Sequence, residues 1–207
     1  ATFAFSCMDG RINISVATGV PPGIIVPFRN LGGRFDLGWP HFGEVLAEHI
    51  GGVVEKGRGA LVLVTYHYSK GDFHRGCAGF GYDTDAARSH TFETKRMVEA
   101  VFGSGHNAVY PLVCGFETDE DALVLHGCGG EVLDLSTISS TSLDTLPGLL
   151  TRLYPDMPDQ TLQDLLPLVE GNISHIENMR QSNRQLETEH VEHHEWMIGI
   201  GRGFDWL

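Results

Sequence analysis

The chain has 207 residues, of which 42% are hydrophobic and 20% charged, a composition typical of a globular protein with a buried core. Lysine and arginine number 14 against 27 aspartate and glutamate residues, so the formal net charge is −13. This excess of negative charge argues against nucleic acid and anionic membranes as partners, because both are themselves negative. No apolar run approaches the roughly 20 residues that a membrane span needs.

The first half of the chain alternates short apolar segments with a helical pattern. Three segments have the pattern of strands, which we place at residues 2–6, 24–28 and 60–66. The third is continuously apolar, which is typical of a strand covered on both faces in a parallel sheet. Between the second and third strands, residues 41–55 place their apolar side chains on one helical face.

The second half continues the alternation and then becomes helical. We expect a helix over 84–103, strands over 109–116 and 122–126, a Ser/Thr-rich loop over 136–142, helices over 143–153 and 159–185, and a last strand over 197–201. This order indicates an α/β fold with a mainly parallel central sheet flanked by helices, followed by a helical region at about 143–185. We expect residues 1–207 to form a single domain.

Two polar segments directly follow predicted strands. Cys7 ends the first strand, and the strand at 60–66 leads through His67 and His74 to Cys77. Because ligands bind outside the carboxyl ends of strands in open α/β sheets, the two segments can converge on one crevice. Two thiolates and one imidazole suit tetrahedral Zn²⁺, and three protein ligands leave the fourth position for water. On this reasoning either histidine can supply the imidazole.

Several motifs resemble one enzyme family. Cys-x-Asp-x-Arg at residues 7–11, followed by a strand-end histidine and a later cysteine, resembles the β-class carbonic anhydrases. The similarity is closer to the carboxysome shell carbonic anhydrases, a divergent branch once called the epsilon class. Further matches to the family lie at residues 29–33, 64–69, 74–78, 115–122 and 193–201. The resemblance implies a β-carbonic-anhydrase-like fold and a lyase that uses zinc, with cadmium as a substitute, to hydrate carbon dioxide reversibly to bicarbonate and a proton.

The resemblance also implies roles for individual residues. Cys7, His67 and Cys77 would hold the metal, because the ligand in the shell branch is the strand-end histidine, here ten residues before the cysteine. Asp9 would accept a hydrogen bond from the zinc-bound nucleophile, and Arg11 would hold the Asp9 carboxylate ionised and in position.

Three more residues are candidates for the pocket or for a proton relay: Tyr68, His74 and His193. The backbone N–H groups of residues 76–79 are candidates for binding bicarbonate oxygens. With His67 as the metal ligand, His74 becomes a residue of the loop at the mouth of the site.

Assembly and location follow from the same resemblance. Shell-branch enzymes carry an N-terminal helical domain and a C-terminal half that lacks a site, and these residues contain neither. We therefore expect a homodimer or higher oligomer, or else a chain from which N- and C-terminal domains are missing. No signal peptide is visible, so we expect a cytoplasmic protein, and only family analogy suggests the carboxysome and its shell as a partner.

Two alternatives use the same residues. Hydrolysis of carbonyl sulfide or carbon disulfide would need the same metal ligands and a differently shaped pocket. A structural zinc or assembly protein without activity would close the site with a fourth ligand, Asp9 or Cys128, and would have no need of the Asp9–Arg11 pair. A thiol redox protein is disfavoured because the chain has no Cys-x-x-Cys.

Overall fold

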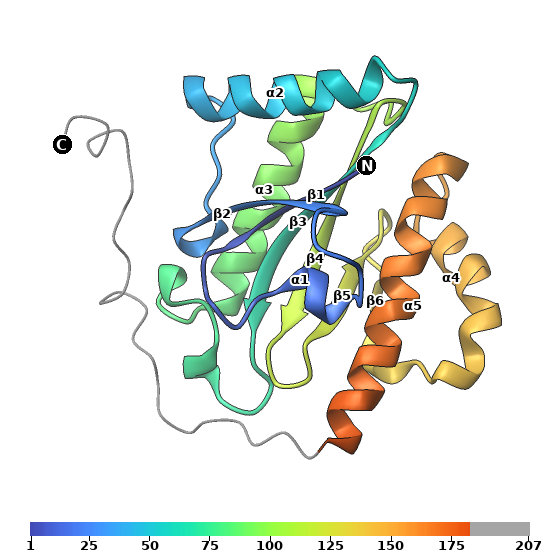
Figure 1. Ribbon diagram of the computed structural model, residues 1–207. Coiled ribbons are helices and arrows are strands. Elements are labelled where there is room, and N and C mark those ends of the chain that lie inside the picture. The colour runs from blue at the N-terminus through green and yellow to red at the C-terminus, as the bar shows by residue number, and fades with distance from the viewer. Residues whose placement is uncertain (183–207) are drawn as a thin grey trace.

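A six-stranded sheet organises the computed structural model, which describes residues 1–182 (Figure 1). Its strands are β1 (Thr2–Cys7), β2 (Ile25–Asn30), β3 (Ala60–Tyr68), β4 (Val109–Glu117), β5 (Ala122–His126) and β6 (Val132–Asp134). The spatial order is β2-β1-β3-β4-β5-β6. The first four strands pair in parallel, and β5 and β6 extend the sheet antiparallel. The predicted α/β fold with a mainly parallel sheet is confirmed.

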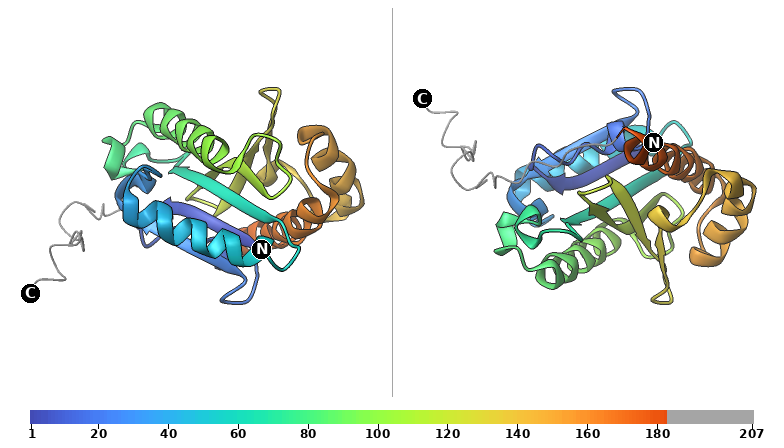
Figure 2. Two further views of the ribbon diagram at one scale, coloured as in Figure 1. Left: turned by 90° about the horizontal axis from the view of Figure 1, so that it is seen from above. Right: turned by 90° about the horizontal axis from the view of Figure 1, so that it is seen from below.

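Helices cover both faces of this sheet (Figure 2). They are α1 (Ile14–Ala17), α2 (Pro40–Val54), α3 (Thr84–Phe102), α4 (Leu146–Leu153) and α5 (Asp159–Gln181). Helices α2 and α3 pack on one face, and α1, α4 and α5 pack on the other. The predicted C-terminal helical region is therefore present over the described residues. Among these residues, no helix combines the length and the apolar character needed to cross a bilayer.

The central strand β3 shows why the sequence is continuously apolar there. Leu61 and Leu63 are buried against the α5 side of the sheet, whereas Val62 and Val64 are buried against the α2 and α3 side. Successive side chains of a strand point to opposite faces, so both sets must be apolar when both faces are covered. The same alternation decides which side chains at the end of β3 share a face.

Some elements differ from the sequence predictions. The short elements α1 and β6 were not predicted, and the expected loop at 136–142 overlaps the 3-10 turns Leu135–Thr137 and Ser140–Thr145. Helix α4 begins at Leu146 rather than at residue 143, because Pro147 fits only the first turn of a helix. The expected strand at 197–201 lies outside the described residues.

Candidate metal centre

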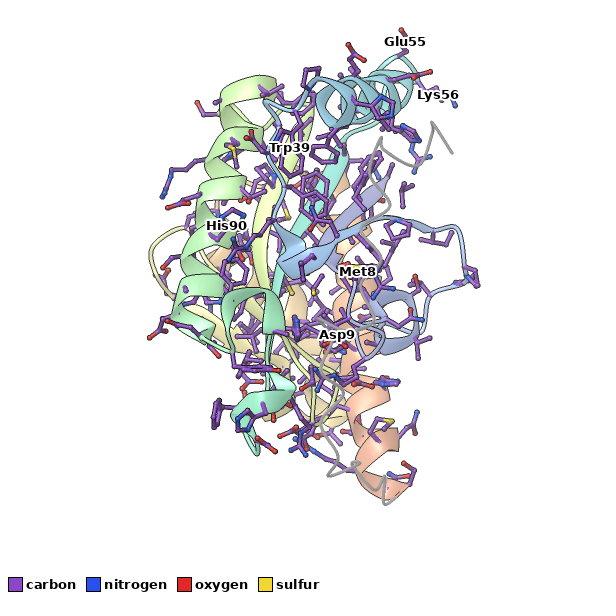
Figure 3. All side chains as sticks on the ribbon, turned by 90° about the vertical axis from the view of Figure 1, so that its left-hand side faces the viewer. Met8, Asp9, Trp39, Glu55, Lys56 and His90 are labelled. Atoms are coloured by element: carbon purple, nitrogen blue, oxygen red, sulfur yellow. The ribbon has the colours of Figure 1, made fainter. Side chains whose placement is uncertain are left out.

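Cys7, His67 and Cys77 come together at the carboxyl edge of the sheet. Cys7 is the last residue of β1, His67 is the penultimate residue of β3, and Cys77 caps the 3-10 turn Ala78–Phe80. Since β1 and β3 are parallel neighbours, their ends meet at the same edge (Figure 3, where Met8 and Asp9 mark the chain just after β1). One ligand atom from each of the three residues lies within 4.8 Å of the others.

The surroundings of His67 fit a metal ion. The residue is 1% exposed, and neither of its ring nitrogens has a hydrogen-bond partner among residues 1–182. Its Nδ1 lies 3.9 Å from Asp9 Oδ2, beyond hydrogen-bond distance. Buried polar atoms without partners cost free energy, so this imidazole needs a further ligand. Two buried thiols beside it complete a donor set that suits Zn²⁺.

The two thiols influence each other directly. Hydrogen bonding with Cys77 lowers the pKa of Cys7 to about 4, despite burial, and the neighbouring His67 ring adds to this effect. The same hydrogen bond, together with burial, raises the pKa of Cys77 far above its ordinary range. The hydrogen bond between the two sulfurs thus stabilises one thiolate and keeps one proton on the pair. Metal binding would release that proton, because a coordinating cysteine is deprotonated.

Asp9 adjoins the cluster and is held by Arg11. Arg11 donates to Asp9 Oδ1 from Nε at 3.1 Å and to Oδ2 from Nη2 at 2.6 Å, and its backbone N–H reaches Oδ1 at 2.9 Å. Burial opposes ionisation of this carboxyl group, but the hydrogen bonds from Arg11 outweigh it and lower the pKa of Asp9 to about 2. Arg11 Nη2 also lies 3.5 Å from the Gly76 carbonyl, beside Cys77.

Arg29 fixes the backbone that carries Cys7 and Asp9. Its guanidinium donates to the carbonyl oxygens of Cys7 at 3.2 Å, Asp9 at 2.6 Å and Ile12 at 2.8 Å. The segment 29–33, which resembles the family, therefore contacts the site through the Arg29 side chain. Further along it, Gly33 has φ +63°, and a Cβ there would lie 3.2 Å from the Cys7 nitrogen. Glycine is needed at this position for both reasons.

Two of the three relay candidates, His74 and Tyr68, lie away from the three ligands. His74 is on the exposed turn Phe73–Arg75, with Nδ1 3.3 Å from Asp72 Oδ1, and does not join the two cysteines. Tyr68 lies on the α3 side of β3, opposite to His67, and its ring stacks on Tyr66 with centroids 5.9 Å apart. Burial raises the pKa of Tyr68 to about 12. His193 lies outside the described residues.

Acidic side chains at the end of β4 lie next to the site. The sequence analysis assigns no role to any single residue of the 115–122 motif. Glu117 and Asp119 accept hydrogen bonds from the loop that joins His67 to Cys77. Two signals in the sequence point to this stretch: its resemblance to the family at residues 115–122, and an acidic run that directly follows a buried strand. Cys128 is separate from the cluster, since its Sγ contacts Tyr110 and Asp156 instead.

Comparisons with known proteins agree with the motifs. Residues 46–139 match the model of the family described as carboxysome shell carbonic anhydrase, catalytic domain. The match confirms the resemblance for that segment, which contains His67 and Cys77. No curated protein sequence matches the chain.

Solved structures of carbonic anhydrases are also similar to the chain. The β-carbonic anhydrase CcaA is 12% identical with a TM-score of 0.47, covering 64% of this chain and 76% of that one. A carbonic anhydrase from Streptococcus mutans is 18% identical with a TM-score of 0.35, covering 64% and 80%. One from a study of two tetrameric β-carbonic anhydrases of Sordaria macrospora is 10% identical with a TM-score of 0.37, covering 65% and 79%.

Proposed function

We propose that this chain, whose residues 46–139 match the carboxysome shell carbonic anhydrase catalytic-domain model, reversibly hydrates carbon dioxide to bicarbonate and a proton with the help of zinc. The observation that carries the proposal is the buried Cys7–His67–Cys77 group beside a carboxylate that Arg11 keeps ionised. A metal-ligand set alone fits many proteins. The adjoining Asp9–Arg11 pair adds a group that can act on a nucleophile.

Cys7, His67 and Cys77 would hold the ion through two sulfurs and one imidazole nitrogen. Zinc in such a site lowers the pKa of a coordinated water to about 7 and so supplies hydroxide at neutral pH. Asp9 would accept a hydrogen bond from the attacking water at Oδ2, the oxygen that lies 3.9 Å from His67. That hydrogen bond would fix the direction in which the water's lone pair meets the carbon of the substrate.

Arg11 has two effects on Asp9 in this scheme. It keeps the carboxylate ionised at any pH near neutral, so Asp9 accepts hydrogen bonds and does not donate one. Arg11 also donates a hydrogen bond to each carboxylate oxygen of Asp9. These bonds hold the carboxylate on Arg11, which disfavours Asp9 as a fourth metal ligand and favours it as a hydrogen-bond partner of the nucleophile. A fourth position left open to solvent is what distinguishes a catalytic zinc site from a structural one.

The structure favours catalysis over a structural zinc site. A site closed by four protein ligands has no use for an ion pair beside it, and burying the Asp9 carboxylate of that pair costs free energy. Cys128, the other candidate for a fourth ligand, contacts Tyr110 and Asp156 rather than the cluster. Hydrolysis of carbonyl sulfide would use the same residues, so the test includes that substrate.

The test measures zinc content and stopped-flow hydration of carbon dioxide under reducing conditions. We expect about one zinc per chain, and we expect Asp9→Asn to retain zinc but lose roughly 100-fold or more in turnover. Asp85→Asn, an exposed position on α3, is the matched control and should behave as the wild type. A zinc-loaded wild type that leaves carbon dioxide unchanged would contradict the proposal, and hydrolysis of carbonyl sulfide in that case would replace it.

We also propose that the chain forms a homodimer. Trp39 is 53% exposed and Met8 is 40% exposed, and both are large apolar side chains (Figure 3). A second copy of the chain that covered these side chains would remove them from water. Native mass spectrometry at micromolar concentration should show two chains per particle, and Trp39→Glu should shift the mass to that of one chain. A wild type that is monomeric throughout would contradict this proposal.

A further inference from the structure

We infer that Asp119 is a positioning residue for the metal centre, because its carboxylate holds the loop between His67 and Cys77 in the shape that brings Cys77 to the other two ligands. The inference rests on the metal site proposed above. It concerns a residue that belongs neither to the ligand set nor to the Asp9–Arg11 pair.

Asp119 contacts this loop at three places. Its Oδ1 accepts a hydrogen bond from Ser69 Oγ at 2.7 Å, and its Oδ2 accepts one from the Gly71 backbone N–H at 2.7 Å. Its Oδ1 also forms an ion pair with Arg75 Nη2 at 3.0 Å. One carboxylate therefore binds the start, the middle and the end of residues 69–76. The Asp119 and Arg75 side chains are only 15% and 17% exposed, so water competes weakly for these contacts.

The sheet in turn holds Asp119 in place. Glu117, which is 0% exposed, accepts the backbone N–H of Asp119 at 3.2 Å and that of Lys70 at 3.0 Å. Thr118 donates its backbone N–H to the Tyr68 carbonyl at 2.8 Å. Glu117 lies opposite Tyr68 in the parallel pairing of β3 and β4, one position beyond His67. Asp119 is therefore held by the end of β4, which pairs directly with the end of β3 that carries His67.

Gly71 shows how closely the loop approaches the carboxylate. A Cβ at this position would lie 2.9 Å from Asp119 Oδ2 and 2.8 Å from Arg75 Nη2. A side chain there would push the carboxylate away from the Gly71 N–H or displace the guanidinium. Gly71→Ala is therefore a second way to disturb the same contacts without removing the charge.

Such an anchor matters because nine residues lie between His67 and Cys77. Within the loop, only the short turn Phe73–Arg75 is helical, so closing it costs conformational entropy. The apparent affinity of a metal falls in proportion to the fraction of molecules in the competent conformation. Contacts that orient metal ligands are typically worth 10- to 100-fold in metal affinity.

The experiment titrates the metal-free protein with Co²⁺ and records visible absorption, which reports both affinity and ligand geometry. We expect Asp119→Ala to weaken Co²⁺ binding by roughly 10- to 100-fold and to change the absorption of the bound ion. Asp119→Asn should cause a smaller loss, because the amide keeps one acceptor oxygen but loses the ion pair with Arg75. Asp85→Asn, with a side chain 82% exposed, is the charge-matched control and should leave both readouts unchanged.

The outcomes separate this inference from the proposed function. A wild type that binds no Co²⁺ overturns the metal site itself. A wild type that binds Co²⁺, with an Asp119→Ala variant of equal affinity and identical absorption, overturns the positioning role alone. If circular dichroism shows that Asp119→Ala does not fold, Gly71→Ala decides, since weaker Co²⁺ binding in that variant supports the role and unchanged binding overturns it.

Discussion

At the scale of single residues, two histidines offer competing ways to complete the metal centre. His74 and Cys77 form a His-x-x-Cys motif, whereas His67 precedes Cys77 by ten residues. His67 is buried at the end of β3 and grouped with both cysteines, and His74 lies on an exposed turn. The rigid strand determines the choice, because a ligand on regular structure is held more precisely than one on a turn.

Paired substitutions test this choice. We expect purified His67→Ala to contain less than about one tenth of the wild-type zinc, since two thiolates alone bind the ion weakly. His74→Ala should retain about one zinc per chain and the thermal stability of the wild type, because exposed side chains contribute little to stability. Elemental analysis of both proteins gives the answer. Loss of zinc from His74→Ala but not from His67→Ala would show that the ligand assignment is wrong.

The sequence predicts some of these residues and not others for a physical reason. Cys7 could be recognised because it ends an apolar strand, and strand ends of a parallel sheet share one edge. That reasoning leaves His67 and His74 both open, and the family resemblance favours His67. Asp119 could not be recognised, because its role depends on contacts with Ser69 and Gly71, 50 and 48 residues away. An acidic residue after a strand is usually solvated, and only the folded hairpin shows which backbone groups it meets.

At the scale of elements, two 3-10 turns next to the site pack closely against each other. Gly79 follows Cys77 within the turn Ala78–Phe80, and Gly32 belongs to the turn Leu31–Gly33 after β2. A Cβ on Gly79 would lie 2.6 Å from the Gly32 Cα, closer than real Cβ atoms approach backbone. The absence of both side chains thus allows the turn after Cys77 to pack against the neighbouring turn.

We therefore expect Gly79→Ala and Gly52→Ala to change stability in opposite directions. Gly79→Ala must separate the two turns and should destabilise the fold by roughly 1–3 kcal/mol. Gly52 is inside α2 with nothing near its Cβ position, so alanine there should stabilise by up to about 1 kcal/mol through helix propensity. Urea unfolding of both variants measures the two free energies. A neutral or stabilising Gly79→Ala would show that the close packing of the turns is unimportant.

Element prediction from the sequence works where periodicity is strong. The strands β1, β3 and β4 and the helices α2 and α3 lie close to their predicted ranges, because each has a clear pattern of apolar residues. The short elements α1 and β6 have only four and three residues. Periodicity cannot indicate elements of this length, and contacts with α5 and β5 stabilise them instead.

At the scale of the whole molecule, two carboxylates form hydrogen bonds that connect elements far apart in the sequence. His106, in the turn after α3, lies between Glu99 Oε1 at 3.0 Å and Asp156 Oδ2 at 2.7 Å. Asp156 belongs to the segment between α4 and α5, and it also accepts a hydrogen bond from Tyr110 on β4 at 2.7 Å. One histidine and two carboxylates thus connect α3, β4 and the C-terminal helical region.

The interactions of Glu99 and Asp156 with His106 and Tyr110 should make the stability of the fold depend on pH. Burial opposes ionisation of Glu99 and Asp156, but the hydrogen bonds that each accepts outweigh it and lower the pKa of both groups. Each therefore binds fewer protons in the folded chain than in the unfolded chain near pH 4, so stability falls as the pH drops through that range. Glu117 acts in the opposite direction, because burial raises its pKa.

We expect the melting temperature to fall between pH 6 and pH 3, and to fall less steeply in the double variant Glu99→Gln, Asp156→Asn. The variant should be less stable than the wild type at pH 6, and the difference should shrink as the pH falls and the wild-type carboxylates take up protons. Differential scanning calorimetry across this range measures both curves, with exposed Asp85→Asn as the control. The net charge passes through zero near pH 5.1 and becomes positive below it in all three proteins. The resulting change in self-repulsion is nearly the same in each and so does not account for the difference. Parallel curves for the wild type and the double variant would contradict the prediction.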